Sequence, residues 1–359
     1  MKILIFDEQT NNTIEQVVLL LRTLNPIAII LGGSYSTGEQ CKLTISDRLY
    51  CLSDFDFFVV CNRITQSEID SVYQQAICLS ESLQQHNPYY HIGFKFRTPE
   101  EINNEYNTIY YWELINNGIN IYNKNYSLPK PTGNICDLLG MPRSKKIQDY
   151  LFRCGVARLW CNILFFPIRL ITMPTDINFD IWYSYFLCRG ALDWITFRLL
   201  YSGIHAYQYS ERFNLWQNHE GFKDKNISIY TICYDVKIGK RRINYKSIIN
   251  DIQKLSYEEI KSYMRTATES QVVEVEFLFH MFSSLVKLVL HVDAISSLKY
   301  AAYYLNSLTT EPIIKPCCTT TMWCQLRRTY SDYRLNRSLL DKRDHHVNTE
   351  RFLNLGEGI

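Results

Sequence analysis

An apolar run that leads directly into two glycines places the strongest constraint on the fold of this chain. Residues 27–31 read IAIIL, and Gly32, Gly33 and Ser34 follow without a gap. A short, continuous apolar run is typical of a strand that is buried on both faces. Two glycines at its end allow a tight turn that exposes main-chain N–H groups, a conformation that binds anions. We therefore expect a buried strand that ends in a phosphate-binding turn at Gly32, Gly33 and Ser34.

A second motif places two acidic residues at the start of another apolar run, DFDFFVV at 54–60. Alternate residues of a strand project to the same face, so Asp54 and Asp56 are predicted to lie side by side. Two adjacent carboxylates repel each other unless a cation neutralises them. Mg²⁺ is usually bound by one or two carboxylates together with substrate phosphates. Asp54 and Asp56 are therefore expected to hold Mg²⁺, and with the glycine turn they predict a site for a nucleoside triphosphate.

The rest of the sequence up to about residue 130 mixes helical and strand patterns. Helical periodicity and its capping signals, including a capping box at Thr65 and Glu68, predict helices at 13–24, 66–85 and 100–116. Short apolar or alternating runs predict strands at 27–31, 54–60, 89–96 and 119–122, and a hairpin at 41–52. This order predicts an N-terminal α/β domain, residues 1–130, that is built around a mixed sheet.

The pattern changes after the linker-like sequence SLPKPTGN at 127–134. Helical periodicity dominates the remainder, at 144–166, 180–201, 246–266, 269–293 and 296–308. One hairpin is predicted at 227–245, with its turn at Gly239. Residues 135–359 are therefore expected to form a mostly helical domain that binds an acceptor or a partner.

Charge and hydropathy restrict the classes of partner. The formal net charge is +2, which favours a small molecule or a protein over long nucleic acid as the partner. The two most apolar stretches, 151–171 and 272–292, carry charged residues, so we expect buried helices and no membrane span. The first residues lack the pattern of a signal peptide, which favours a cytoplasmic protein.

The two motifs together resemble the signature of the nucleotidyltransferase superfamily typified by DNA polymerase β. The matching residues are LGGS at 31–34 and SDFDFFVV at 53–60, and the wider similarity extends over about 13–126. Gly38-Glu39 and the hairpin before the acidic pair are similar to stand-alone bacterial members of that superfamily. The resemblance implies a Mg²⁺-dependent enzyme that moves a nucleoside monophosphate from a triphosphate, with ATP as the expected donor, to a hydroxyl acceptor and releases pyrophosphate. It implies that Asp54 and Asp56 are the catalytic and metal-binding residues.

One position departs from the superfamily pattern. A third acidic residue usually stands on the strand after the intervening helix, and the corresponding residue here is Lys95. Lys95 is expected to face the same side as Asp54 and Asp56 and to contact the phosphates as a nucleotide-binding residue. The alternative is a weakened or inactive protein of the same fold that binds a nucleotide or a partner. A third reading leaves Lys95 on the solvent-facing side of an edge strand.

Two further acidic residues, Glu39 and Glu113, belong to the predicted N-terminal domain. Glu39 is expected to be a solvated loop residue, with a place close to the site as the alternative. Glu113 is expected to be exposed on its helix.

Overall fold

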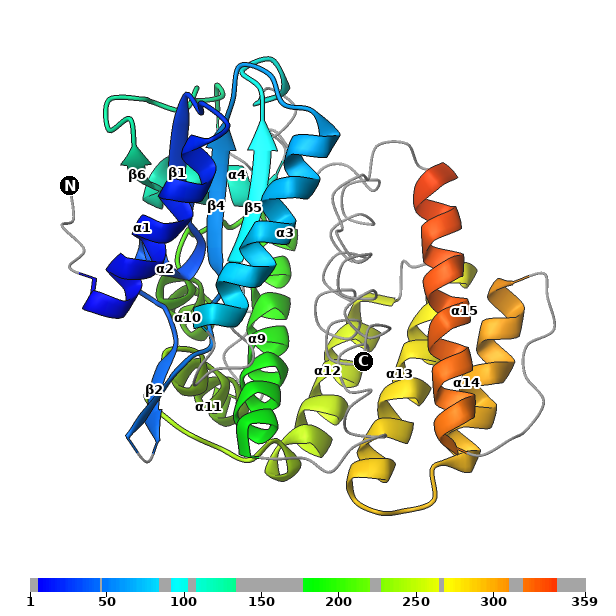
Figure 1. Ribbon diagram of the computed structural model, residues 1–359. Coiled ribbons are helices and arrows are strands. Elements are labelled where there is room, and N and C mark those ends of the chain that lie inside the picture. Colours follow the sequence, from blue (N-terminus) through cyan, green and yellow to red (C-terminus); the bar gives the residue numbers. More distant parts are fainter. Residues whose placement is uncertain are drawn as a thin grey trace. The chain divides into compact units, whose positions relative to one another are not determined.

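The computed structural model shows an α+β protein with a small mixed sheet and a helical C-terminal region (Figure 1). The structure describes residues 6–45, 47–83, 92–102, 108–133, 177–219, 227–264, 268–309 and 319–340. The predicted helix at 144–166 and the apolar stretch at 151–171 lie outside the described residues.

The chain divides into two compact units that are not consecutive in sequence. The first unit comprises Met1–Gln148, Arg198–Ile227 and Thr231–Arg242, and the second comprises Asp149–Phe197, Ser228–Tyr230 and Ile243–Ile359. Residues 198–227 and 231–242, which the sequence pattern assigned to the C-terminal domain, therefore cluster with the first unit.

A four-stranded sheet forms the centre of the first unit. The strand order is β5-β4-β1-β6, and its members are β1 (Ala28–Gly32), β4 (Phe55–Val60), β5 (Ile92–Arg97) and β6 (Ile119–Tyr122). β1 runs antiparallel to β4 and β6, whereas β4 and β5 are parallel, so the sheet is mixed as predicted.

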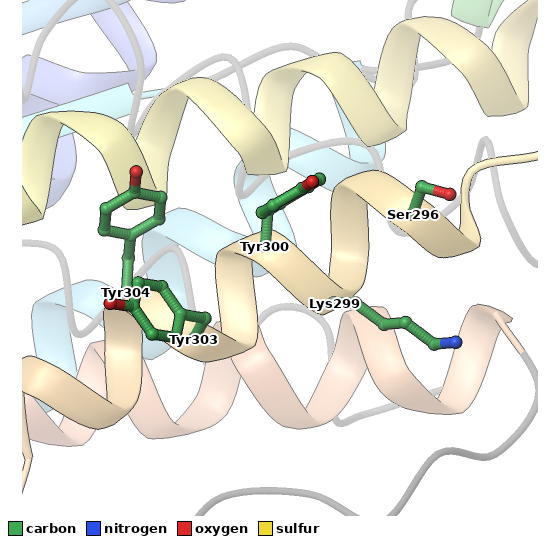
Figure 2. A pocket seen from close by; sticks show the side chains of 5 residues that line it. All are labelled: Ser296, Lys299, Tyr300, Tyr303 and Tyr304. Carbon is green, nitrogen blue, oxygen red and sulfur yellow. The ribbon is translucent and has the colours of Figure 1, made fainter.

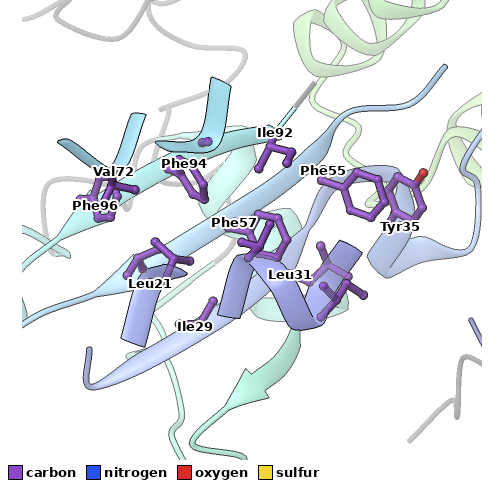
Figure 3. Close-up of a cluster of buried hydrophobic side chains, with 14 of the residues drawn as sticks. Leu21, Ile29, Leu31, Tyr35, Phe55, Phe57, Val72, Ile92, Phe94 and Phe96 are labelled. Atoms are coloured by element: carbon purple, nitrogen blue, oxygen red, sulfur yellow. The ribbon is translucent and has the colours of Figure 1, made fainter. Parts of the chain in front are cut away.

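The larger core of the first unit lies between this sheet and helices α1 (Glu8–Arg22) and α3 (Gln66–Leu83) (Figure 1). Phe57 and Phe94 lie on this face of the sheet, where they contribute to a cluster of large aromatic side chains (Figure 3). The predicted capping box begins α3, because Thr65 N donates to the Glu68 carboxylate over 2.7 Å. Alternate residues of β5 are buried on this face, whereas nearly every residue of β4 is buried because both faces of that strand are covered.

The opposite face of the sheet packs against α4 (Ile109–Asn117) and positions the candidate site. Phe58 and Val60 of β4 lie in this smaller core with Tyr111 and Leu114 of α4. Asp56 is two residues before Phe58 on the same strand, so it projects to the same face. The predicted hairpin is present as β2 (Lys42–Ile45) and β3 (Arg48–Cys51).

The hairpin predicted at 227–245 is wrong, because residues 227–237 form helix α11 (Ile227–Lys237). The alternating Ile and Tyr residues indicated a strand, but Tyr230, Cys233 and Val236 are buried at helical spacing. The turn at Gly239 is real and ends the helix. Gly239 has φ +74°, and the N–H of Lys240 donates to Asp235 O over 2.8 Å, as in a Schellman cap.

The second unit is helical in its described part, as the sequence pattern predicted. Its helices are α9 (Ile177–Tyr201, whose last residues belong to the first unit), α12 (Ile249–Tyr263), α13 (Glu269–Val289), α14 (Ile295–Leu308) and α15 (Thr319–Leu340), with a short 3₁₀ turn η4 (Tyr245–Ser247). Phe277 of α13 contacts the ring of Tyr330 of α15, and both side chains are buried. Among the described helices, none has the length and apolar character that a membrane crossing needs.

Candidate functional site

The two glycines at the end of β1 form a turn that only glycine fits. Gly33 has φ +62° and begins the short helix α2 (Gly33–Thr37). A Cβ atom on Gly33 would lie 2.3 Å from Oδ2 of Asp56, and one on Gly32 would lie 3.0 Å from the Leu114 side chain. The glycines therefore allow the main chain to approach a carboxylate and a neighbouring helix closely.

Asp56 of the acidic pair lies beside this turn. Asp56 on β4 is the register partner of Gly32 on β1, and Asp54 immediately precedes the first residue of β4. Both aspartates are partly buried. The structure thus brings Gly32, Gly33 and Asp56 together, as the two motifs predicted.

Lys95 also lies on the face of the sheet that carries Asp56. The parallel register pairs Asp56 with Gly93 and Phe58 with Lys95, so the side chains of Asp56 and Lys95 project to one side. The Lys95 Nζ lies 5.3 Å from the centre of the Tyr110 ring, a cation–π contact. The Tyr110 hydroxyl is in turn 3.3 Å from the position of a Cβ on Gly32. Lys95 and Gly32 thus both lie close to Tyr110 of α4.

Ser34 has a partner that the motif analysis did not include. Its Oγ accepts a hydrogen bond of 2.9 Å from the ammonium of Lys237, the last residue of α11. Lys237 is completely buried, and its Nζ also donates to the main-chain oxygen of Glu39 over 3.3 Å. The sequence analysis missed Lys237 because it predicted a hairpin at 227–245. Only the spacing of a helix places Lys237 on the same face as the buried residues of α11.

Two other acids differ from their expected exposure. Glu39 is buried, and its two carboxylate oxygens each accept a hydrogen bond of 2.8 Å, from the N–H groups of Tyr209 and Ser210. These N–H groups begin helix α10 (Tyr209–Asn218), so Glu39 caps that helix and is not a solvated loop residue. Glu113 is not exposed either, because it forms an ion pair with the buried Arg212 of α10.

The buried thiols next to the site are poor nucleophiles. Burial raises the pKa of the Cys41 thiol to about 12, although the nearby Lys237 opposes the shift. Burial also raises the pKa of Cys51. Both thiols therefore stay protonated at neutral pH, and the chemistry of the site depends on its carboxylates, hydroxyl and ammonium groups.

The donor set suits Mg²⁺ that is shared with a phosphate ligand. Within the described ranges, no three His, Cys, Asp or Glu side chains gather as a complete metal cage. Asp56 supplies a carboxylate beside a turn that leaves Gly33 and Ser34 partly exposed, and Asp54 precedes it by two residues in the chain. Two carboxylates with substrate phosphates and water are a usual coordination for Mg²⁺.

A concave surface lies on α14, in the other unit, and its chemistry differs from that of the candidate site. Ser296, Lys299 and three tyrosines line this open depression, with Tyr300 and Tyr303 on its exposed side (Figure 2). It offers hydroxyl groups and one ammonium but no carboxylate. It therefore cannot hold a metal ion in the way that Asp54 and Asp56 can.

No family model, curated protein or solved structure matches this chain. The functional argument therefore depends on the residues and their geometry.

Proposed function

We propose that the first unit is a Mg²⁺-dependent nucleotidyltransferase, with ATP as the expected donor. The observation that supports this most is the contact between the Asp56 carboxylate and the Gly33 turn. A side chain at position 33 would occupy the space of that carboxylate. A pair of carboxylates and a bare main-chain turn in one place suit a metal-bound triphosphate.

Each residue of the site has a role in this proposal. Gly32 and Gly33 let the phosphate chain approach the main chain, and Ser34 and Lys95 contact phosphate oxygens. Asp54 and Asp56 would hold Mg²⁺, which when bound neutralises the charge of the phosphates. The acceptor oxygen would form a bond to the α-phosphorus while the bond from that phosphorus to the bridging oxygen breaks. The hydroxyl proton would pass to water, and pyrophosphate would leave. A small molecule or a protein is the acceptor that the weak net charge favours.

A nucleotide- or partner-binding protein without transferase activity is the second candidate, and Lys95 favours it. An ammonium on the same face as Asp56 neutralises part of the negative charge that would attract a metal ion. In that case nucleotide binding would not depend on Mg²⁺.

Calorimetric titration with ATP separates the two candidates. We expect the wild-type chain to bind ATP in the presence of Mg²⁺ and at least tenfold more weakly without it, because the carboxylates repel unshielded phosphates. Asp54→Asn and Asp56→Asn remove the metal ligands and should abolish this dependence on Mg²⁺. Asp70→Asn on the exposed face of α3 is the control and should bind as the wild type does.

Binding that is equally strong without Mg²⁺ and in both variants would support the second candidate. Incubation with α-labelled triphosphates and cell extract then tests transfer directly. Label that enters a small molecule or protein with the wild type, but not with Asp56→Asn, supports the transferase. Label in neither sample contradicts it.

A further inference from the structure

We propose that Lys237 is a positioning residue of the nucleotide site, which orients the Ser34 hydroxyl to donate to the phosphate chain of the ligand. The inference rests on the proposed function, because it assumes that a phosphorylated ligand occupies the turn at Gly33. It extends that proposal to a residue 203 positions away in the sequence.

The contacts of Lys237 place its ammonium against the turn. Nζ lies 2.9 Å from Ser34 Oγ and 3.3 Å from the Glu39 main-chain oxygen, and it lies 5.0 Å from the centre of the Tyr209 ring. The side chain has no exposed surface. A buried ammonium carries a large desolvation cost, so its retention beside the turn indicates a use for its charge or its donors.

The chemistry of the two groups sets the direction of the hydrogen bonds. An ammonium can only donate, so Ser34 Oγ accepts from Lys237 and keeps its own O–H for another acceptor. Ser34 is partly exposed and follows Gly33, whereas Lys237 approaches from the buried side. The hydroxyl proton is therefore available to a phosphate oxygen in the turn. The positive charge behind the hydroxyl strengthens that donation.

The rest of α11 and α10 holds Lys237 in place. Cys41 Sγ contacts Val236 O at 3.3 Å, and the Glu39 carboxylate binds the first N–H groups of α10. Ser34, Glu39 and Cys41 are thus joined to α10 and α11 by several hydrogen bonds. An ammonium fixed in this way can set the geometry of Ser34 before a ligand arrives, which lowers the cost of binding.

A double-mutant cycle on the full-length chain tests whether Lys237 acts through Ser34. The dissociation constants of ATP and of inorganic tripolyphosphate, each with Mg²⁺, are measured for wild type, Ser34→Ala, Lys237→Met and the double variant. We expect each single variant to weaken ATP binding about tenfold, as for one lost hydrogen bond to a charged group. The double variant should bind ATP no more weakly than the single variant with the lower affinity, because Lys237 acts through Ser34. Tripolyphosphate should show the same factors, because the contact is to the phosphate chain.

Lys240→Met is the matched control, since Lys240 is exposed and lies just beyond the same helix. It should leave both dissociation constants unchanged. Thermal melts identify variants that have lost the fold. If Lys237→Met is not folded, Lys237→Gln replaces it in the cycle. The amide of the glutamine side chain keeps an N–H donor but lacks the positive charge.

The possible outcomes separate this inference from the proposed function. Losses that multiply in the double variant, or a Lys237→Met variant that binds as the wild type does, overturn the role of Lys237 and leave the proposed function standing. A wild-type chain that binds neither ATP nor tripolyphosphate overturns both. Losses that appear with ATP but not with tripolyphosphate overturn the assignment of Ser34 to the phosphate chain.

Discussion

Gly33 is required both by the backbone conformation of the turn and by the position of the Asp56 carboxylate. Its φ of +62° costs little for glycine but roughly 1–2 kcal/mol for most residues with a side chain. Its missing side chain also leaves the space that the Asp56 carboxylate occupies. The glycine turn itself is local and could be predicted from the sequence, whereas the approach of Asp56 comes from the pairing of β1 with β4.

Substitution of Gly33 separates these two requirements. Gly33→Ala introduces the conformational cost and also forces the Asp56 carboxylate to move. Gly203→Ala is the matched control, because Gly203 lies in the same unit with φ +76° and has open space around a Cβ. We expect Gly33→Ala to lower the free energy of unfolding by at least about 1 kcal/mol more than Gly203→Ala, as measured in urea. Equal losses would show that the carboxylate does not press against the turn.

His205 makes the first unit sensitive to acid. Burial, together with the nearby Arg212, lowers the pKa of His205 from 6.5 to about 4. Neither of its ring nitrogens has a hydrogen-bond partner among the described residues. The folded state therefore keeps the ring neutral in a pH range in which the unfolded chain takes up a proton.

The sign of this effect can be measured. Between about pH 6.5 and 4 the unfolded state binds more protons, so the free energy of unfolding should fall as the pH is lowered. His205→Phe removes that proton uptake and should lose less stability than the wild type between pH 7 and 4.5. Urea denaturation at both pH values gives the comparison. Parallel losses in the two proteins would contradict a buried, neutral His205.

At the scale of elements, α10 depends on a carboxylate from a distant part of the chain. Glu39 accepts hydrogen bonds from Tyr209 N and Ser210 N, where the helix dipole also favours a negative charge. Gln208, the N-cap residue of α10, makes no side-chain hydrogen bond to the helix. Glu39 therefore does for α10 what a local Ser or Asp does for most helices.

Removal of this cap should destabilise the first unit. We expect Glu39→Ala to lower the free energy of unfolding by about 1–3 kcal/mol, because it leaves two N–H groups without their acceptor. Glu211→Ala is the control. Glu211 is exposed in the first turn of α10 and accepts one hydrogen bond of 3.1 Å, from Tyr207 N. Its loss should cost less than about 1 kcal/mol. A similar cost for both variants in urea denaturation would show that burial of the Glu39 carboxylate adds nothing.

At the scale of the whole molecule, the sequence predicted elements better than it predicted how they combine. Short-range patterns sufficed for β1, β4 and the Thr65–Glu68 capping box, since the residues that specify each element lie within a few positions of one another. The sequence also predicted that the acidic pair and the glycine turn share one site, and the structure pairs Gly32 with Asp56 across two antiparallel strands.

Long-range contacts set the limit of prediction. The β-branched and aromatic residues of 227–237 favoured a strand, but Tyr230, Cys233 and Val236 are buried at helical spacing in α11. Lys237, Glu39 and Arg212 owe their positions to partners 99 or more residues away. No periodicity in a single sequence encodes such pairs, so the buried partners of the site were missed.

The divided connectivity of the first unit has a consequence for how the protein is made. The chain leaves that unit after Gln148, and the segments that complete it reach as far as Arg242. A nascent chain on the ribosome therefore has its sheet long before it has Lys237. Ser34 gains its contact with Lys237 only after 203 further residues have been synthesised, so the proposed nucleotide site is completed well after the strands that carry its motifs.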